Sequence, residues 1–348
     1  MTNILEEISK SCGCDTTYKP ADFKVENDVR WCSGCGSYGI LSQVQKILPE
    51  LGVPKEKFVF ISGIGCSGRF SYYVDTYGFH SIHGRPIAIA SGLKLARPDL
   101  SVWVATGDGD CMSIGGNHMI HACRRNINLN VLMFNNEVYS LTKGQYSPTS
   151  QQGQVTKSSP LGVLEEPFVP AGLALGSGAT MVGRGFDRDA AGMKNMFKAA
   201  HDHQGLSFIE LYTNCVIFND SAFDPFTSRQ SRKEHTVNVE HGKPLVFGEN
   251  DDKGIIMDGF KPKVVSLADG YSVSDFLVHD QHDVALAYII AQMSYHNPEL
   301  PRAMGILQSI VKPSYDQLTE AQIAHEQEAK GKPDVQKLLR GKDSWVVE

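Results

Sequence analysis

Short apolar runs rich in β-branched and aromatic residues alternate with longer segments over the first two thirds of the chain. The short runs have the length of β-strands and lie at 57–62, 101–106, 129–134, 180–184 and 206–212. The segments between them have helical patterns, which predict helices at 37–51, 87–97, 112–125 and 188–203. This alternation predicts an α/β fold built on a doubly wound, mostly parallel sheet.

The two ends of the chain depart from this pattern. Residues 1–30 are polar and are interpreted as an N-terminal arm, residues 31–220 carry the α/β alternation, and residues 221–348 form a C-terminal extension. The extension contains a helix near 281–293 and a charged, helical tail over 318–339. We expect it to cover the core or a partner protein.

Composition excludes several classes of protein. The chain has 348 residues and a net charge of −6, and no basic run or basic–aromatic patch indicates nucleic-acid binding. No apolar stretch is long enough to span a bilayer, and the first residues lack the pattern of a signal peptide. Eight cysteines without a secretory signal indicate a reducing compartment, so we expect a cytoplasmic protein whose thiols bind metal rather than form disulfides.

Glycine and polar residues follow two of the predicted strands. The strand at 101–106 leads into Gly107-Asp108-Gly109-Asp110, and the strand at 129–134 leads into Asn135-Asn136. Ligands of open α/β sheets bind at the carboxyl ends of strands, so we expect Asp108 and Asn136 to share one site. Carboxylate, amide and carbonyl oxygens suit Mg²⁺, while glycines and a helix N-terminus suit a diphosphate. The pattern predicts a metal-bridged diphosphate; the plain alternative is a tight turn followed by a polar strand end.

Cysteines occur at several predicted element ends. Cys32 and Cys35 form a Cys-x-x-Cys at the start of the first helix, and Cys66 and Cys215 each follow a strand. Thiols in this arrangement suit redox chemistry, zinc or a [4Fe–4S] cluster, which takes four thiolates. Two further pairs have other interpretations: Cys111 and Cys123 as buried small residues in a helix, and Cys12 and Cys14 in the arm as competing metal ligands.

Other candidate residues lie close to these motifs in the sequence. Gly65 and Ser67 flank Cys66 in a glycine-rich strand exit, and His83 precedes the second helix, where it can face a cofactor or support structure. Lys143 follows the amide pair and opens a Ser/Pro/Gln-rich loop that reaches about residue 162. Long loops inside compact domains are often functional, so this lysine can meet an anionic substrate.

Taken together, the motifs resemble those of known enzyme families. Gly-Asp-Gly followed by Asn-Asn resembles the signature of thiamine diphosphate enzymes, which implies Asp108, Asn136 and the Val138 carbonyl as Mg²⁺ ligands. Five motifs in order, at 31–36, 63–69, 83–85, 107–110 and 141–145, resemble the β subunit of 2-oxoacid:ferredoxin oxidoreductases, particularly the 2-oxoglutarate branch. The resemblance covers roughly residues 30–220. It implies one [4Fe–4S] cluster bound by Cys32, Cys35, Cys66 and Cys215.

The resemblance also implies an activity and partners. Thiamine diphosphate would serve as the electron sink for decarboxylation of a 2-oxoacid, with electrons passing through the cluster to ferredoxin and the acyl group to coenzyme A. For 2-oxoglutarate the products are succinyl-CoA and CO₂, and the reverse carboxylation uses the same site. The chain has one doubly wound sheet, so an α subunit is expected to supply the glutamate that contacts the aminopyrimidine, in an αβ or α₂β₂ assembly.

The resemblance and the residue types further assign roles within the site. Arg69 and Lys143 are candidates for binding substrate carboxylates because they are cations, and Leu141 is expected to pack against the thiazolium. The expected cofactor contacts are Gly65, Cys66, Ser67, His83, Gly107, Asp108, Gly109, Asp110, Asn136, Val138, Leu141 and Thr142.

Three alternatives stay open at this point. The same chemistry can act on pyruvate or a branched-chain oxoacid. A non-oxidative thiamine diphosphate decarboxylase or carboligase would use the cysteines structurally or for zinc. An electron-transfer iron–sulfur subunit would carry a cluster without thiamine. Cofactor content separates these alternatives.

Overall fold

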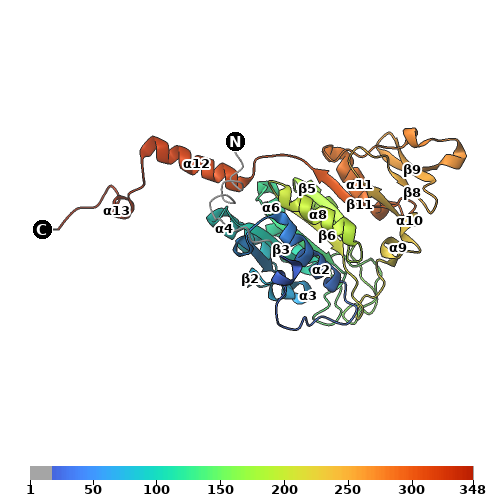
Figure 1. Cartoon of the computed structure of the whole chain (residues 1–348), viewed down its shortest axis with the longest axis horizontal. Coiled ribbons are helices and arrows are strands. Elements are labelled where there is room, and N and C mark those ends of the chain that lie inside the picture. The colour runs from blue at the N-terminus through green and yellow to red at the C-terminus, as the bar shows by residue number, and fades with distance from the viewer. Residues whose placement is uncertain (1–17, 348) are drawn as a thin grey trace.

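The computed structural model describes residues 18–347 and contains one main sheet of eight strands (Figure 1). The strand order is β2-β1-β3-β4-β6-β5-β11-β7, and neighbouring strands are parallel except for the antiparallel pair β5 and β11. The strands are β1 Phe58–Ser62, β2 Tyr77–His80, β3 Ser101–Gly107, β4 Asn130–Asn135, β5 Met181–Phe186, β6 Ser207–Tyr212, β7 Thr236–Val239 and β11 Arg302–Ser309. The prediction of a doubly wound, mostly parallel α/β fold is confirmed.

Helices bury both faces of this sheet. One face packs against α2 (Ser37–Ile47) and α8 (Ala190–Asp202). The other packs against α4 (Pro86–Ala96), α6 (Gly116–Arg125), α7 (Pro170–Gly176) and α11 (Val284–His296). Along β3 the side chains alternate between the two cores: Val102 and Val104 join one core, while Trp103 and Ala105 join the other. Side chains in a strand point alternately to opposite faces, so a strand buried on both sides must be apolar throughout. This explains the continuous apolar runs of the sequence.

The remaining helices are short or lie beyond β11. Those beyond β11 are α12 Tyr315–Lys330 and α13 Val335–Arg340. The short ones are α3 Gly65–Gly68, α5 Asp108–Met112, α9 Asp224–Thr227 and α10 Arg232–His235. Single 3₁₀ turns occur at η1 Pro20–Phe23, η2 Leu48–Leu51, η3 Lys55–Lys57, η4 Arg69–Tyr72, η5 Leu267–Asp269 and η6 Val273–Asp275.

The predicted helix at 112–125 is wrong in its start and continuity. Helix α5 already begins at Asp108, so the acidic motif is the first turn of a helix rather than a turn before one. The chain then breaks at Ser113 and resumes as α6 at Gly116. Gly115 sits against the Asp110 carbonyl with no room for a side chain, and two consecutive glycines favour a break over a continuous helix.

The C-terminal part contributes to the main sheet as well as to smaller units. Strands β7 and β11 complete the sheet, whereas β8 (Val246–Phe247), β9 (Lys253–Asp258) and β10 (Lys261–Ser266) form a separate antiparallel sheet. Beyond β11, helices α12 and α13 extend away from the body in Figure 1, and residues 331–347 are exposed. The predicted division at residue 220 stays a prediction.

The N-terminal side of the described chain packs onto the body. Phe23, in the expected arm, is fully buried beside α2 and β1 residues. Cys12 and Cys14 lie outside the described residues, so their predicted role stays open. Over residues 18–347, no helix has both the length and the apolar character needed to cross a membrane.

Candidate functional site

A cleft of about 390 Å³ opens at the carboxyl ends of the central strands. Neighbouring strands β3 and β4 end at Gly107 and Asn135, so the residues that follow them meet at one edge of the sheet. The cleft is lined by these residues predicted from sequence: Gly65, Cys66, Ser67, Arg69, His83, Gly107, Asp108, Gly109, Asp110, Asn136, Val138, Leu141 and Thr142. Residues not predicted, among them Tyr72, His80, Tyr139 and Thr213, complete the lining. A cleft of this size suits a small molecule or cofactor.

Asp108 is a buried carboxylate that receives hydrogen bonds only from neutral groups. Asp108 lines the cleft and is only 2% exposed. Its Oδ2 accepts hydrogen bonds from the hydroxyls of Ser147 (2.5 Å) and Thr149 (2.7 Å). None of the ion pairs within residues 18–347 involves Asp108, and burial raises the pKa of its carboxyl group. A buried carboxylate without a cationic partner is costly, so this position favours a bound cation.

The oxygens needed to complete a cation site lie on the next strand end. The Asn136 Oδ1 accepts a hydrogen bond from the Val138 backbone N–H (3.2 Å), and its Nδ2 donates to Ser140 Oγ (2.8 Å). Between them Glu137 has a left-handed backbone with φ of 53°, which turns the chain sharply at this point. Carboxylate, amide and carbonyl oxygens from Asp108, Asn136 and Val138 therefore line one cleft, and this donor set fits Mg²⁺.

The other members of the acidic motif position their neighbours. The Tyr139 hydroxyl donates to the Gly109 carbonyl (3.0 Å), and a Cβ on Gly109 would lie 2.3 Å from the tyrosine ring. Asp110 accepts hydrogen bonds from the Gly84 backbone N–H (2.6 Å) and the Thr106 hydroxyl (2.9 Å). The glycine is thus required for close packing, and the Asp110 carboxylate holds the turn that follows His83.

Four cysteines converge beside this cleft. Burial, together with the nearby Cys35, Cys215 and Cys32, raises the pKa of the Cys66 thiol to about 11. Burial also raises the pKa of Cys35, with added effects from Cys215 and Cys32. The Trp31 indole N–H donates to the Cys66 carbonyl (2.8 Å), which joins the Cys-x-x-Cys segment to the turn that carries Cys66. The set predicted from sequence is therefore brought together in space.

The spacing of these sulfurs is wider than that of a closed zinc site. A tetrahedral zinc with Zn–S bonds of about 2.3 Å places its sulfurs about 3.8 Å apart. Within residues 18–347, the group of potential ligands whose atoms all lie within 4.8 Å of one another is His241, Asp280 and His282, and no three of the cysteines form such a group. The four sulfurs as placed therefore do not form a closed zinc site.

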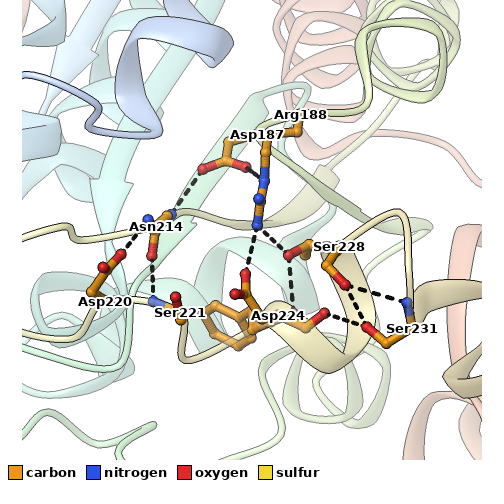
Figure 2. A network of polar contacts seen from close by, with 10 residues as sticks. Asp187, Arg188, Asn214, Asp220, Ser221, Asp224, Ser228 and Ser231 are labelled. Atoms are coloured by element: carbon orange, nitrogen blue, oxygen red, sulfur yellow. Dashed lines mark hydrogen bonds and ion pairs between the residues drawn. The ribbon is translucent and has the colours of Figure 1, made fainter.

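A polar network fastens the loop that carries Cys215 (Figure 2). Asp187, directly after β5, accepts a hydrogen bond from the Asn214 backbone N–H (2.8 Å). The Asn214 carbonyl in turn accepts from the Gly36 N–H (3.1 Å), next to Cys35. Arg188 extends the network through an ion pair with Asp224 at 3.0 Å. Asp187 thus connects both cysteine segments to the end of the sheet.

A second buried network lies behind Asp108. The Thr149 hydroxyl is also 3.0 Å from Asn135 Oδ1, and Asn135 Nδ2 donates to Glu210 Oε1 (2.9 Å). Glu210 pairs with Arg184 at 2.8 Å, and both side chains are fully buried. These residues were missed from the sequence, although charged residues inside otherwise apolar strands β5 and β6 are a signal for such a network. Ser147, Thr149 and Asp187 carried no comparable signal.

The predicted substrate residues differ in their positions. Arg69 lines the cleft and donates to the Arg30 carbonyl (2.5 Å), and Leu141 lines it with half of its surface exposed. Lys143 is exposed in a tight turn with φ of 78° and is not among the residues that line the cleft. The role of all three in substrate binding stays a prediction.

Comparisons with known proteins agree with this site. A family model described as "Thiamine pyrophosphate enzyme, C-terminal TPP binding domain" matches residues 63–211, so fold and cleft define a thiamine diphosphate-binding enzyme domain. The chain is 48% identical to "2-oxoglutarate oxidoreductase subunit KorB" of Mycobacterium tuberculosis, over 99% of this chain and 94% of that protein. It is 38% identical to "2-oxoglutarate synthase subunit KorB" of Methanocaldococcus jannaschii, over 68% of this chain and 89% of that protein. The chain belongs to the family of β subunits of 2-oxoacid:ferredoxin oxidoreductases.

A solved structure supports the same assignment. The 2-oxoglutarate:ferredoxin oxidoreductase from Magnetococcus marinus, with 2-oxoglutarate, coenzyme A and succinyl-CoA bound, matches with a TM-score of 0.74 and 32% identity. The match covers 94% of this chain and 97% of that chain. The resemblance indicated by the sequence motifs is thus confirmed, and the chain is part of an oxidoreductase.

Proposed function

We propose that this chain is the cofactor-binding β subunit of an enzyme that converts 2-oxoglutarate, coenzyme A and two oxidised ferredoxins to succinyl-CoA, CO₂, a proton and two reduced ferredoxins. The names of both relatives and the ligands of the solved structure support 2-oxoglutarate as the substrate. The reverse carboxylation uses the same groups. Pyruvate is the main competing substrate, and the experiment below distinguishes the two.

The observation that carries this proposal is that Cys66 and Asp108 line the same cleft. Asp108 belongs to the set of oxygen ligands, and Cys66 belongs to the set of four cysteines. Thiamine diphosphate, when bound, supplies the electron sink for decarboxylation. A redox centre bound through Cys66 would then be adjacent to that chemistry, as electron removal from the decarboxylated substrate requires.

The oxygen ligands support a specific arrangement of the cofactor. Asp108, Asn136 and the Val138 carbonyl would bind Mg²⁺, which neutralises the buried carboxylate and leaves coordination positions for the diphosphate. Gly107 and Gly109 allow close approach of the diphosphate to the backbone. Ser147 and Thr149 hold the Asp108 carboxylate in place through its Oδ2.

The cysteines support a [4Fe–4S] cluster rather than zinc. Cys32, Cys35, Cys66 and Cys215 provide the four thiolates such a cluster needs, and their spacing exceeds that of a closed zinc site. Burial raises the pKa of Cys35 and Cys66, so iron would have to displace their protons on binding. In this position the chain would pass electrons singly to ferredoxin.

Substrate and partner would meet the open side of the cleft. Arg69 and Leu141 both line the cleft. Arg69 would bind a substrate carboxylate, and Leu141 would provide an apolar contact. Exposed apolar side chains surround the same region on and beside edge strand β2, including Tyr72, Tyr77, Phe79 and Ile82. An α subunit that covers this surface would exclude water from the cleft and supply the missing glutamate.

The direct test is turnover by the complete enzyme. The chain is purified anaerobically with its α subunit, and viologen reduction is followed with coenzyme A and either 2-oxoglutarate or pyruvate. We expect reduction that depends on coenzyme A and is faster with 2-oxoglutarate. Faster reduction with pyruvate would overturn the substrate assignment. No reduction with either acid, in a preparation that contains thiamine diphosphate and iron, would overturn the proposed activity.

A further inference from the structure

Two surface turns bring a group of metal-binding side chains together at the β7 edge of the main sheet, whereas the cofactor cleft lies at the ends of β3 and β4. His241 follows β7, the edge strand, and Asp280 and His282 precede α11. One potential ligand atom from each residue lies within 4.8 Å of the others, and His241 Nδ1 is 3.5 Å from Asp280 Oδ1. All three side chains are exposed, so an ion from solvent can reach them.

The hydrogen bonds of the two imidazoles identify the ring nitrogen that each can offer to a metal ion. The Nδ1 of His282 is 2.7 Å from the Ser309 carbonyl, which can only accept, so the proton lies on Nδ1 and Nε2 keeps its lone pair. The Nδ1 of His241 accepts a long hydrogen bond from the Gln281 backbone N–H (3.3 Å), so this nitrogen is unprotonated, and a metal ion bound to it would replace that hydrogen bond. A backbone carbonyl bound to the far nitrogen is the usual way in which proteins orient a metal-binding histidine.

The backbone around the group is already ordered. The Gly242 N–H donates to the His279 carbonyl (2.8 Å), and the His279 N–H donates to the Lys243 carbonyl (2.9 Å). These bonds join the turn that carries His241 to the segment that carries the other two residues. Asp283 caps α11 by accepting from the Leu286 N–H (3.0 Å), which fixes the chain immediately after His282. The ligands therefore stand on a rigid support, which reduces the ordering cost of binding an ion.

We propose that His241, Asp280 and His282 bind one divalent transition-metal ion, most favourably Zn²⁺, with water in the open position. Two imidazoles and one carboxylate are ligands of zinc, whereas Mg²⁺ takes oxygen ligands almost alone. In tetrahedral zinc with bonds of about 2.0–2.1 Å, ligand atoms lie about 3.3 Å apart, close to the separation of His241 Nδ1 and Asp280 Oδ1. The ion joins the turn after β7 to the start of α11 and so stabilises the edge of the main sheet.

This site is separate from the groups assigned above. It uses none of the four cysteines and none of the oxygen ligands around Asp108, so its loss leaves those sets intact. It also differs from the i, i+3 pair of histidines on α6, His118 and His121, which lacks a third ligand within the described chain. A single ion per chain is therefore expected from this group.

The test compares zinc binding in three forms of the full chain. Chelator-treated, anaerobically purified wild-type protein is titrated with ZnCl₂ by calorimetry beside His282→Ala and the control His296→Ala, an exposed histidine at the end of α11. We expect His282→Ala to lack one binding event, or to show affinity lowered at least about 100-fold, since even residues that only orient a ligand are worth 10–100-fold. His296→Ala should match the wild type.

A second readout excludes a misfolded variant. Without metal, all three forms should unfold at the same temperature, and Zn²⁺ should raise the unfolding temperature of the wild type and of His296→Ala more than that of His282→Ala. Asp280→Asn should behave as His282→Ala does. Equal stoichiometry, affinity and thermal shift in wild type, His282→Ala and Asp280→Asn would overturn the proposal.

Discussion

Asp108 combines burial, negative charge and neutral hydrogen-bond donors, and this combination defines its role. The residue is 2% exposed, and hydroxyls of the loop after β4 are the side-chain donors to its Oδ2. Hydroxyls orient a carboxylate without neutralising it, so the isolated chain holds an uncompensated buried charge. Binding of Mg²⁺ with thiamine diphosphate, as proposed, would remove this cost and would make cofactor binding and fold stability depend on the same residue.

The substitution Asp108→Asn should therefore abolish stabilisation by the cofactor without lowering the stability of the protein alone. Without cofactor, the variant is expected to unfold at the same or a higher temperature than the wild type, because the buried charge is gone. Mg²⁺ with thiamine diphosphate at about 100 times its Kd should stabilise the wild type by about 2.7 kcal/mol and leave the variant unchanged. Thermal unfolding with and without the cofactor measures both effects.

The control for this substitution is Asp202→Asn, which removes an exposed carboxylate on α8 that pairs with Lys198. It should retain the full stabilisation by the cofactor. A cofactor-dependent rise in unfolding temperature in Asp108→Asn equal to that of the wild type would contradict the assignment of Asp108 as a metal ligand.

At the scale of single residues, sequence reasoning succeeded where a motif is local. Asp108 and Asn136 each directly follow a recognisable strand, so their meeting at one sheet edge follows from parallel topology. Ser147, Thr149 and Asp187 act through loops whose return path is decided by tertiary packing. Their distance in sequence from their partners hides their role, and no local pattern of residue types predicts it.

At the scale of elements, the site depends on close packing between the Cys-x-x-Cys segment and the loop that carries Cys215. Gly36, in the Cys-x-x-Cys segment, packs closely against the loop that carries Cys215. A Cβ added at Gly36 would lie 1.8 Å from Asp187 Oδ2 and 2.8 Å from the Asn214 backbone nitrogen. One of these atoms is backbone, so the contact cannot be relieved by a side-chain rotation alone. The network of Figure 2 therefore requires glycine at this position.

The substitution Gly36→Ala is expected to displace the two segments and to lower the iron content of anaerobically purified protein by about half or more. The matched control is Gly92→Ala inside α4, where a Cβ meets open space. This control should keep its iron and gain stability of about 0.5–1 kcal/mol from the better helix former. The iron content per chain is measured with a chromogenic chelator. An iron content in Gly36→Ala equal to that of the wild type would show that glycine is not required at this position.

Sequence reasoning missed several elements, among them β7 and β11 of the main sheet, and two of its errors lie beside the cleft and have a physical reason. The helix expected at 112–125 begins earlier and breaks, because the glycine pair at 115–116 and contacts with the Gly84 turn outweigh helical periodicity. Strand β2 was not predicted, because it is only four residues long and all four are exposed, so no run of buried apolar residues marks it. Both cases lie beside the cleft, where packing against a site overrides local preference.

At the scale of the whole molecule, the cleft remains open beside an apolar surface. Tyr77 and Phe79 occupy alternate positions of β2, so they point to the same side, and they are 66% and 52% exposed. An edge strand with exposed aromatic residues is a surface that soluble proteins usually cover. This position suits the α subunit, because the same contact would close the cleft.

The double substitution Tyr77→Ser with Phe79→Ser should weaken association with the α subunit by about 30-fold or more, since buried aromatic anchors contribute about 1 kcal/mol or more each to an interface. The control is Phe260→Ser, which removes an 89% exposed aromatic residue at the turn between β9 and β10. Analytical ultracentrifugation of the mixed subunits measures the association. Unchanged association of the double variant would place the α subunit on another surface.

We propose that one chain binds thiamine diphosphate and a [4Fe–4S] cluster side by side, with Cys215 as a cluster ligand. The most direct measurement is iron, sulfide and thiamine diphosphate content, with an electron paramagnetic resonance spectrum, of anaerobically purified Cys215→Ala beside Cys123→Ala. Cys123 is a buried cysteine in the core on α6, away from the four converging thiols. We predict that Cys215→Ala loses the cluster and keeps thiamine diphosphate, while Cys123→Ala keeps both. A complete cluster in Cys215→Ala would show that Cys215 is not a cluster ligand.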